Sequence, residues 1–217
     1  MTQKLLLLDM DGVIYQGSNF WLDLHRAMGT EDFALDLWDR MSVSDYVELS
    51  ERTAACWKGR SAAPYLQMVA DRQPTWGIKK LLQQAHSQGL YLVVVSSGSW
   101  RLAVRAKADY GIHEIHANRL GISNSGHFDG SVDVQVDDAR KDVTVRRIQA
   151  RLGISPESTM VIGDSRSDIP MVNLAAHSVG YRVKDHAIRG LFETHIDGRS
   201  IAQASSAVGS FSEMVPV

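Results

Sequence analysis

Continuous runs of apolar residues mark three places along the chain as buried strands. Each run is followed directly by acidic, small or hydroxyl residues: Leu5–Leu8 by Asp9-Met10-Asp11-Gly12, Tyr91–Val95 by Ser96-Ser97-Gly98-Ser99, and Met160–Ile162 by Gly163-Asp164-Ser165. Short runs without polar alternation are typical of strands covered on both faces in a parallel sheet. The pattern therefore predicts parallel strands whose carboxyl ends lead into polar loops.

Helical periodicity occupies the segments between and after these strands. Apolar residues recur at helical spacing in Gly77–Gln88, Trp100–Tyr110 and Asp142–Leu152. The first and third patterns stop at Gly89 and Gly153, and glycine is common just past the end of a helix. The alternation of strand, loop and helix predicts an α/β fold: a Rossmann-like, doubly wound parallel sheet built from residues 1–16 and 74–217.

Residues 17–73 interrupt this alternation, because they contain no clear strand pattern. Apolar and bulky residues recur there at helical spacing in two groups: Phe33, Leu37 and Met41, then Tyr46, Leu49 and Thr53. We interpret the segment as a small helical cap domain inserted after the first strand. The alternative is that these helices cover the sheet, but the long gap before the next strand favours an insertion.

Two later segments have weaker patterns. Residues 116–136 read as a hairpin, with turns at Asn124-Ser125-Gly126 and at Asp129-Gly130. Ser205–Val217 is expected to form a loose tail.

The composition is that of an ordinary globular protein. Of the 217 residues, 44% are hydrophobic, and the net charge of −2 argues against a nucleic-acid partner. Cys56 is the single cysteine, and we interpret it as a packed residue and not a catalytic thiol. Leu5–Leu8 is too short for a signal peptide, and no stretch reaches the roughly 18 apolar residues of a membrane span. We therefore expect a cytoplasmic monomer or homodimer with no membrane association.

Two acids, Asp9 and Asp11, directly follow the first predicted strand. Residues two apart in a strand share a face, and two close carboxylates push their pKa values apart. One acid can then stay ionised while the other carries a proton. The alternative interpretation is a simple turn, since Asp-Gly is common in loops.

A second acid pair, Asp164 and Asp168, follows the strand run that ends at Ile162. These carboxylates can cap a helix N-terminus, which is the alternative interpretation. At the carboxyl edge of a parallel sheet, however, they face the same edge as Asp9. Three or four oxygens gathered there form a site for a hard cation, and Mg²⁺ is the expected cofactor.

Candidate phosphate-binding groups also lie at a predicted strand end or helix start. The segment Ser96-Ser97-Gly98-Ser99 leads into a helix, where hydroxyls and exposed N–H groups bind phosphate, although it can also be an ordinary serine cap. Lys141 begins a helix and can hold a transferring phosphoryl oxygen, although lysines there are often solvated. The order and strand-end positions of all these groups together indicate phosphoryl transfer.

The ordered motifs resemble the four motifs of haloacid dehalogenase-like phosphatases. The matching segments are Asp9-Met10-Asp11-Gly12-Val13, Val93–Gly98, Lys141 and Gly163–Asp168. Within that superfamily, the sequence most resembles the phosphoserine phosphatase-like branch. The features that support this are the helical insertion and two segments, Ala117–Leu120 and Asp168–Met171. The resemblance covers residues 4–200 and implies a Rossmann-like core, a small helical cap and Mg²⁺.

The resemblance also implies roles for the acids. Asp9 is the nucleophile that becomes an aspartyl-phosphate, and Asp11 protonates the leaving alcohol and then activates water. Mg²⁺ is held by the side chains of Asp9 and Asp164 and by the backbone carbonyl of Asp11. Asp168 supports the metal, through water.

For the phosphoryl group, the resemblance implies binding by Lys141 and a serine hydroxyl. Counting on from Gly89 favours Ser96, and Ser97, one residue on, is the alternative. Gly98 is expected beside them in the same phosphate-binding loop.

The sequence departs from true phosphoserine phosphatases in the groups that read the substrate. Gly12 and Ser18 stand near the places where those enzymes have a hydroxyl residue and a glutamate that reads the substrate amine. Arg52 is close to the expected position of the arginine that reads the carboxylate, but it is not clearly in register. Ser18 and Arg52 are therefore the candidate substrate contacts of the cap.

The expected function is a Mg²⁺-dependent phosphatase that hydrolyses a small-molecule phosphate monoester through an aspartyl-phosphate. Phosphoserine is the leading candidate substrate. The alternatives are a phosphotransferase or mutase on the same core, a phosphatase for sugar phosphates or other metabolites, and a non-enzymatic signalling protein of the receiver type. The acid set and the inserted cap favour the hydrolase.

Overall fold

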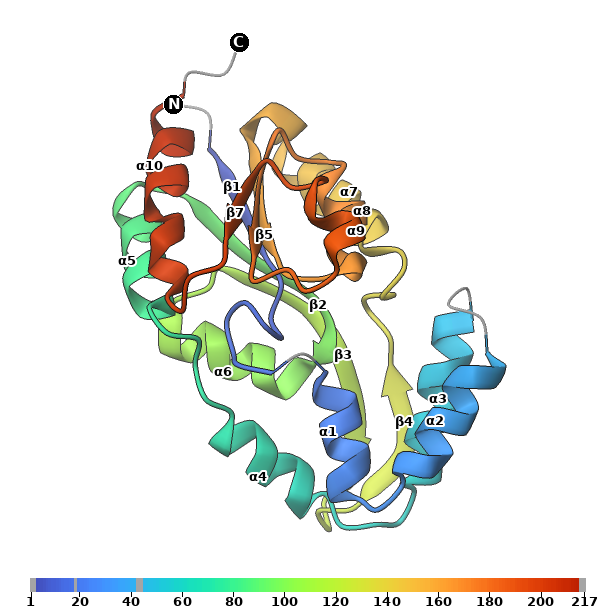
Figure 1. Cartoon of the computed structure of the whole chain (residues 1–217). Helices are drawn as coiled ribbons and strands as arrows, with labels where there is room; N and C mark the ends of the chain where they lie inside the picture. Colours follow the sequence, from blue (N-terminus) through green and yellow to red (C-terminus); the bar gives the residue numbers. More distant parts are fainter. Residues whose placement is uncertain (1–2, 18, 42–44, 215–217) are drawn as a thin grey trace.

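The computed structural model describes residues 3–17, 19–41 and 45–214. Its centre is a seven-stranded sheet in the order β4-β3-β2-β1-β5-β6-β7, with helices on both faces (Figure 1). Neighbouring strands are parallel except for β3 and β4. The strands are β1 (Leu5–Leu8), β2 (Tyr91–Ser99), β3 (Glu114–Ile122), β4 (Phe128–Asp133), β5 (Thr159–Gly163), β6 (His177–Tyr181) and β7 (Thr194–Ile196). The predicted doubly wound α/β fold is confirmed.

The helical segments predicted along the core are also present. The α-helices are α1 (Phe20–Ala27), α2 (Glu31–Arg40), α3 (Tyr46–Cys56), α4 (Ala63–Asp71), α5 (Ile78–Ser87), α6 (Trp100–Tyr110), α7 (Lys141–Leu152), α8 (Ile169–Val172), α9 (His186–Arg189) and α10 (Ser205–Glu213). Three of them, α5, α6 and α7, match the three predicted core helices to within one residue at each end.

Alternate residues of the central strand β1 build two separate cores. Leu6 and Leu8 belong to a cluster that includes residues of α5, α6 and α10, whereas Leu5 and Leu7 belong to a cluster that includes residues of α7, α8 and α9. Because β1 pairs with β2 on one side and β5 on the other, it is fixed at the middle of the sheet. The loops that follow β1, β2 and β5 therefore meet at one edge, where open α/β sheets bind ligands.

Helices α1 to α4, which we call the cap helices, form a separate group beyond that edge (Figure 1). They pack against the β3–β4 hairpin. The N–H of Gly59 donates to the carbonyl of Phe128 at 2.8 Å, the N–H of Phe128 donates to the carbonyl of Arg60 at 2.9 Å, and the rings of Trp57 and Phe128 lie 5.7 Å apart. The hairpin thus packs with the cap helices, although it belongs to the 74–217 segment of the chain.

Two sequence interpretations of irregular segments were wrong. Asp129 and Gly130 lie inside β4 and not in a turn. The carboxylate of Asp129 accepts the N–H and the hydroxyl of Ser131. Such local bonds from an aspartate are common in turns, but here they form within an exposed edge strand. The predicted loose tail, residues 205–217, forms the helix α10 over Ser205–Glu213, and its last three residues lie outside the described part of the chain.

Helix α10 is held by two buried residues one turn apart. Val208 and Phe211 are buried in the cluster that includes α5. The ammonium of Lys4 donates to the carbonyls of Phe211 and Ser212, which satisfies groups at the end of the helix. Because small residues surround Val208 and Phe211, the sequence shows no clear helical periodicity here.

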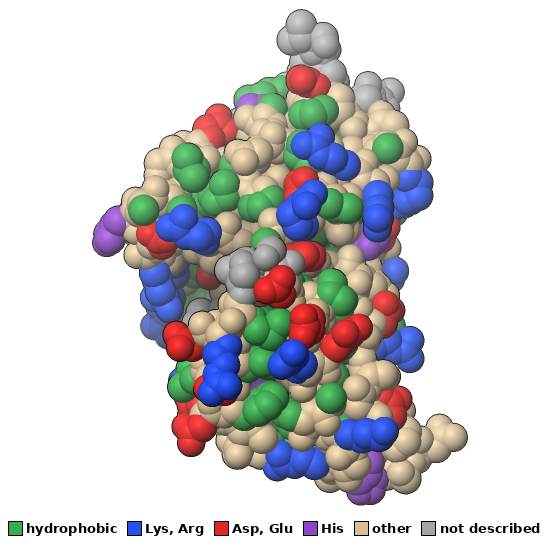
Figure 2. All heavy atoms as spheres, turned by 90° about the vertical axis from the view of Figure 1, so that its right-hand side faces the viewer, with side chains coloured by type: hydrophobic (Ala, Val, Ile, Leu, Met, Phe, Trp, Pro, Cys, Tyr) green, Lys and Arg blue, Asp and Glu red, His purple; other side chains and the backbone are tan. Residues whose placement is uncertain are grey.

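The outer surface is of mixed charge. In Figure 2, which shows the right-hand side of Figure 1, side chains of both signs are interspersed over the face. In the described part of the chain, no helix has both the length and the apolarity to cross a membrane.

Candidate active site

Asp9 lies at the centre of the carboxyl edge of the sheet. Its N–H donates to the carbonyl of Ile162 at 3.0 Å, which continues the pairing of β1 with β5 by one residue. Lys141, the first residue of α7, is 1% exposed, and its ammonium donates to Asp9 Oδ1 at 2.9 Å and to Asp168 Oδ1 at 2.8 Å. A buried lysine thus joins the loop after β1 to the loop after β5.

Asp168 is fully buried and organises the loop after β5. Its Oδ2 accepts the backbone N–H groups of Asp164 at 2.9 Å and Ser165 at 3.0 Å. One oxygen therefore holds Lys141 while the other fixes the turn that carries Asp164. Asp168 thus forms a capping box with Ser165, as the capping interpretation expected, and it also links Lys141 to the loop that carries Asp164.

Three carboxylates meet at this edge. Asp9, Asp164 and Asp168 each offer an oxygen, and these oxygens lie within 4.8 Å of one another. Burial, followed by the charge of Asp168, raises the pKa of Asp9 to about 7 and that of Asp164 to about 9. Such pKa values mean that the protein's own cations do not fully neutralise the cluster. Carboxylate oxygens packed this closely are a donor set that fits a divalent hard cation such as Mg²⁺.

The close approach of the β1 loop to Asp164 requires glycine. Gly12 has φ +84°, and a Cβ built on it would lie 2.1 Å from Asp164 Oδ2. Any side chain at this position would displace the carboxylate.

Asp11 stands apart from the three-carboxylate cluster. Arg72, just past α4, places Nη2 3.3 Å from Asp11 Oδ1 and Nη1 2.7 Å from Asp23 Oδ2. Burial raises the pKa of Asp11 to about 6, while the charge and the hydrogen bond of Arg72 oppose that rise. Asp11 can therefore take up and release a proton near neutral pH.

Ser96 and Ser97, which lie in the last part of β2, make different contacts. Ser96 Oγ is buried and accepts the N–H of Gly98 at 3.0 Å, whereas Ser97 Oγ donates to Asp138 Oδ1 at 2.5 Å. The carbonyl of Ser97 accepts three hydrogen bonds, from Trp21 Nε1 at 2.9 Å, Tyr46 Oη at 3.0 Å and Asn118 Nδ2 at 3.0 Å. These bonds join the end of β2 to α1, α3 and β3.

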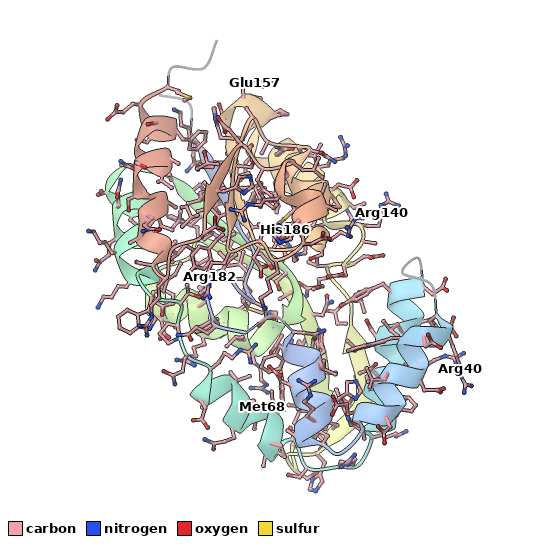
Figure 3. The ribbon with its side chains drawn as sticks, in the orientation of Figure 1. Arg40, Met68, Arg140, Glu157, Arg182 and His186 are labelled. Carbon is pink, nitrogen blue, oxygen red and sulfur yellow. The ribbon has the colours of Figure 1, made fainter. Side chains whose placement is uncertain are left out.

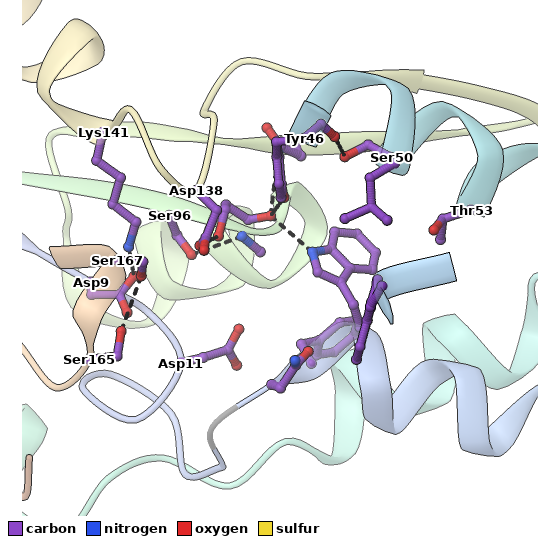
Figure 4. A pocket seen from close by; sticks show the side chains of 18 of the residues that line it. Asp9, Asp11, Tyr46, Ser50, Thr53, Ser96, Asp138, Lys141, Ser165 and Ser167 are labelled. Carbon is purple, nitrogen blue, oxygen red and sulfur yellow. Dashed lines mark hydrogen bonds and ion pairs between the residues drawn. The ribbon is translucent and has the colours of Figure 1, made fainter. Parts of the chain in front are cut away.

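A cavity of about 450 Å³ lies between these loops and the cap helices. Figure 4 shows Lys141 directed toward Asp9 on one side, Ser96, Asp138 and Tyr46 in the middle, and Ser50 and Thr53 of α3 on the cap side. The predicted site residues that line it are Asp9, Asp11, Ser96, Ser97, Gly98, Lys141 and Asp164. Asp168 lies behind them, against Lys141.

Of the two predicted cap contacts, Arg52 does not line this cavity. Its side chain is 58% exposed and pairs with Glu48 one turn earlier in α3. The helical spacing that placed Arg52 near the site does not fix which face of the helix it occupies, and this face is the outer one. Ser18 lies outside the described residues.

Sequence reasoning missed three residues that contact the site. Arg72 reaches Asp11 across 61 positions, and Asp138 accepts from Ser97 across 41. Tyr46 was identified as an apolar position of a cap helix, and no pattern indicated that its hydroxyl bonds the Ser97 carbonyl. None of these residues lies at a predicted strand end, so the rule that found the other groups does not detect them.

Comparison with known proteins agrees with this geometry. Phosphoserine phosphatase from Lactococcus lactis is 26% identical over 203 residues, which cover 91% of each chain. Phosphoserine phosphatase from Archaeoglobus fulgidus is 25% identical over 186 residues, and the match covers 84% of this chain but about half, 54%, of that relative. A solved phosphoserine phosphatase with a phospho-aspartyl intermediate analogue shares the fold, with a TM-score of 0.80 at 20% identity over 95% of this chain and 99% of that one.

The family itself is identified by its sequence profile. That profile, of the haloacid dehalogenase-like hydrolases, matches residues 6–173, which run from β1 through α8 and include every core residue of the site. The chain belongs to the haloacid dehalogenase-like hydrolases.

Proposed function

We propose that this chain is a Mg²⁺-dependent phosphatase that hydrolyses a small-molecule phosphate monoester through an aspartyl-phosphate on Asp9. The observation that carries the proposal is the buried Lys141, which donates to Asp9 and Asp168 beside a third carboxylate, Asp164. A nucleophilic acid, a fixed cation and an under-neutralised acid cluster at one sheet edge are the parts that phosphoryl transfer needs.

Mg²⁺ would be held by the side chains of Asp9 and Asp164 and by the backbone carbonyl of Asp11, with Asp168 supporting it through water. When bound, it supplies positive charge that offsets the negative charge on the transferring group and on the nucleophile. This assignment is supported by the clustered carboxylate oxygens and by their raised pKa values.

In the first step, a carboxylate oxygen of Asp9 attacks phosphorus and the bond from phosphorus to the alcohol oxygen breaks. The electron pair leaves on that oxygen, which takes the proton of Asp11. The raised pKa of Asp11, about 6, supports this acid role, and Arg72 positions the carboxyl. The products are the free alcohol and an aspartyl-phosphate.

In the second step, Asp11, now ionised, removes a proton from water, and the water oxygen attacks phosphorus. The bond from phosphorus to the Asp9 oxygen breaks, which restores the carboxylate and releases inorganic phosphate. Lys141 remains beside Asp9 through both steps and offsets charge on the phosphoryl oxygens.

Ser97 is the serine that we propose for the phosphoryl group. Both serines line the cavity, but Ser97 is partly exposed whereas Ser96 is buried. Ser96 Oγ accepts the N–H of Gly98 within the same strand. Gly98 keeps the loop close to Asp11, since a Cβ there would lie 2.8 Å from Asp11 Oδ2.

Phosphoserine is the substrate to which the relatives' names point. The cap, residues 17–73, is proposed to supply the contacts with the alcohol and to limit access of bulk water.

The first test is Asp9→Asn assayed with p-nitrophenyl phosphate and Mg²⁺. We expect a loss of about 10³-fold or more in kcat, because the amide is not a nucleophile. Asp109→Asn, at an exposed acid of α6 that pairs with Arg105, is the matched control and should keep wild-type activity. Full activity in Asp9→Asn would contradict the proposal.

A further inference from the structure

The cavity has a charged side and an uncharged side. Its charged lining residues all come from outside the cap helices: Asp9, Asp11, Asp138, Lys141, Asp164 and Arg166. The apolar lining comes from the cap helices, their adjoining residues and the hairpin, and includes Trp21, Trp38, Met41, Leu49, Leu120 and Val132. Among the described residues of 17–73, no charged side chain lines the cavity, and the four others, Ser18 and residues 42–44, have no ionisable side chain.

The arginines of the cap helices have partners elsewhere. Arg26 pairs with Glu31 at 2.8 Å, Arg40 with Asp36 at 2.6 Å and Arg52 with Glu48 at 2.5 Å, and all three are more than half exposed. Figure 3 shows Arg40 directed outward from the end of α2. The cap therefore turns these cations toward solvent and keeps apolar side chains toward the cavity.

The histidine that lines the cavity is also uncharged. His25 is fully buried against the ring of Trp57, and burial lowers its pKa to about 4. Its Nδ1 lies 2.8 Å from Thr30 Oγ1, while its Nε2 has no hydrogen-bond partner within the described structure. A neutral imidazole supplies no positive charge that could pair with a substrate carboxylate.

In the described part of the chain, both cations that line the cavity already have carboxylate partners. Lys141 already donates to Asp9 and Asp168, and Arg166 pairs with Asp185 at 2.5 Å on the surface. Burying an unpaired carboxylate is costly, whereas burying apolar area against Trp38 and Leu49 is favourable. A substrate amine could pair with the carboxylate of Asp138, which lines the cavity. Of the two charged groups of serine, the carboxylate is therefore the one that the cavity disfavours.

We propose that the cap side of this cavity binds an uncharged, largely apolar or aromatic leaving group, and that the chain prefers phosphate esters of such alcohols to phosphoserine. This inference rests on the proposed function, because it concerns the alcohol that leaves the phosphate held at Asp9. The chemical class is a phosphate monoester without a carboxylate.

The test compares kcat/KM for benzyl phosphate, phosphoethanolamine and phosphoserine at pH 7 with Mg²⁺. All three are esters of primary alcohols, so the quality of the leaving group does not set the order. We expect benzyl phosphate to exceed phosphoserine by about 100-fold, with phosphoethanolamine between them. A kcat/KM for phosphoserine equal to or above that for benzyl phosphate overturns the inference. Failure to hydrolyse all three esters and p-nitrophenyl phosphate would instead contradict the phosphatase itself.

A variant separates the apolar lining from the phosphate site. Trp38→Ala should lower kcat/KM for benzyl phosphate about tenfold or more, while phosphoethanolamine changes less than about threefold. Leu35→Ala, on the same helix but 49% exposed and outside the cavity lining, is the matched control and should leave both values unchanged. An equal loss for both esters in Trp38→Ala, or no loss for either, contradicts the inference.

Discussion

The ammonium of Lys141 donates a 2.9 Å hydrogen bond to Asp9 Oδ1, although 132 positions separate the two residues. Burial alone would lower the pKa of Lys141, but the charges of Asp168 and Asp9 outweigh that effect and raise it. Lys141 is therefore a fixed positive charge at neutral pH. It can hold a phosphoryl oxygen without having to gain or lose a proton.

Replacing this charge tests its role. Lys141→Met should lower kcat/KM by about 10²- to 10³-fold and reduce the melting temperature, because two buried carboxylates lose their shared cation. Lys141→Arg should not restore activity, since a planar guanidinium does not fit where a compact ammonium joins two carboxylates. The measurement is steady-state hydrolysis of p-nitrophenyl phosphate beside a thermal melt. Lys79→Met, at an exposed position of α5, is the control. Activity of Lys141→Met within threefold of wild type would count against the role.

Asp11→Asn should separate the two chemical steps. p-Nitrophenolate leaves without a proton, so this variant should still release about one equivalent of it in a rapid burst. Turnover then slows by about 10²- to 10⁴-fold, because water lacks its base. Benzyl alcohol needs the proton, and no burst is expected with benzyl phosphate. Rapid-quench measurements with both esters check this; equal bursts, or none with either ester, would rule out a general acid at Asp11.

The strand-end groups could be predicted from the sequence because their signal is local. Asp9, the pair Ser96-Ser97 and Asp164 each stand within a residue or two of an apolar run, and parallel strands bring such positions to one edge. The structure places them around one cavity. The core helices were equally predictable, since their apolar periodicity and their flanking glycines agree.

Contacts between distant segments could not be predicted in this way. Arg72 reaches Asp11 only because α4 ends beside the β1 loop, and Arg52 turns outward because α3 presents its other face to the cavity. The β3–β4 hairpin packs with the cap helices through Phe128, whose partners come from another part of the chain. Such details depend on how elements pack, and periodicity fixes only the elements themselves.

Ser96 and Ser97, in the last part of β2, give a paired prediction. Ser97→Ala should raise KM and lower kcat for p-nitrophenyl phosphate, by about tenfold in kcat/KM, because one hydroxyl to the phosphoryl group is lost. Ser96→Ala should change kcat/KM less and reduce the melting temperature more, since Ser96 is buried and bonds the N–H of Gly98. The reverse order of effects would assign the phosphate to Ser96.

The acid cluster predicts how metal binding depends on pH. The folded pKa values of Asp9 and Asp164, about 7 and about 9, are raised above the ordinary value by burial and neighbouring charge. Without metal, their contribution to stability is present below about pH 4 and is lost as the pH rises through 7 and then 9. The melting temperature of the metal-free chain should therefore fall between pH 6 and pH 8.5 on account of these groups.

Mg²⁺ binds the ionised carboxylates, so the rise in melting temperature that it causes should be larger at pH 8.5 than at pH 6. Asp164→Asn should remove most of that rise and make the metal-free chain more stable at pH 8.5. Thermal melts with EDTA or with excess Mg²⁺ at both pH values measure these effects. A rise that is the same at both pH values, or that survives in Asp164→Asn, would exclude this cluster as the metal site.

The covalent role of Asp9 is the central claim, and chemical trapping tests it most directly. The chain is mixed with p-nitrophenyl phosphate and Mg²⁺, quenched in acid within the first turnover, reduced with borohydride and digested for mass spectrometry. An aspartyl-phosphate is reduced to homoserine, and we expect homoserine at position 9 and at no other acid. Lack of homoserine at position 9 during active turnover, or its appearance at Asp11 or Asp164, would contradict the account.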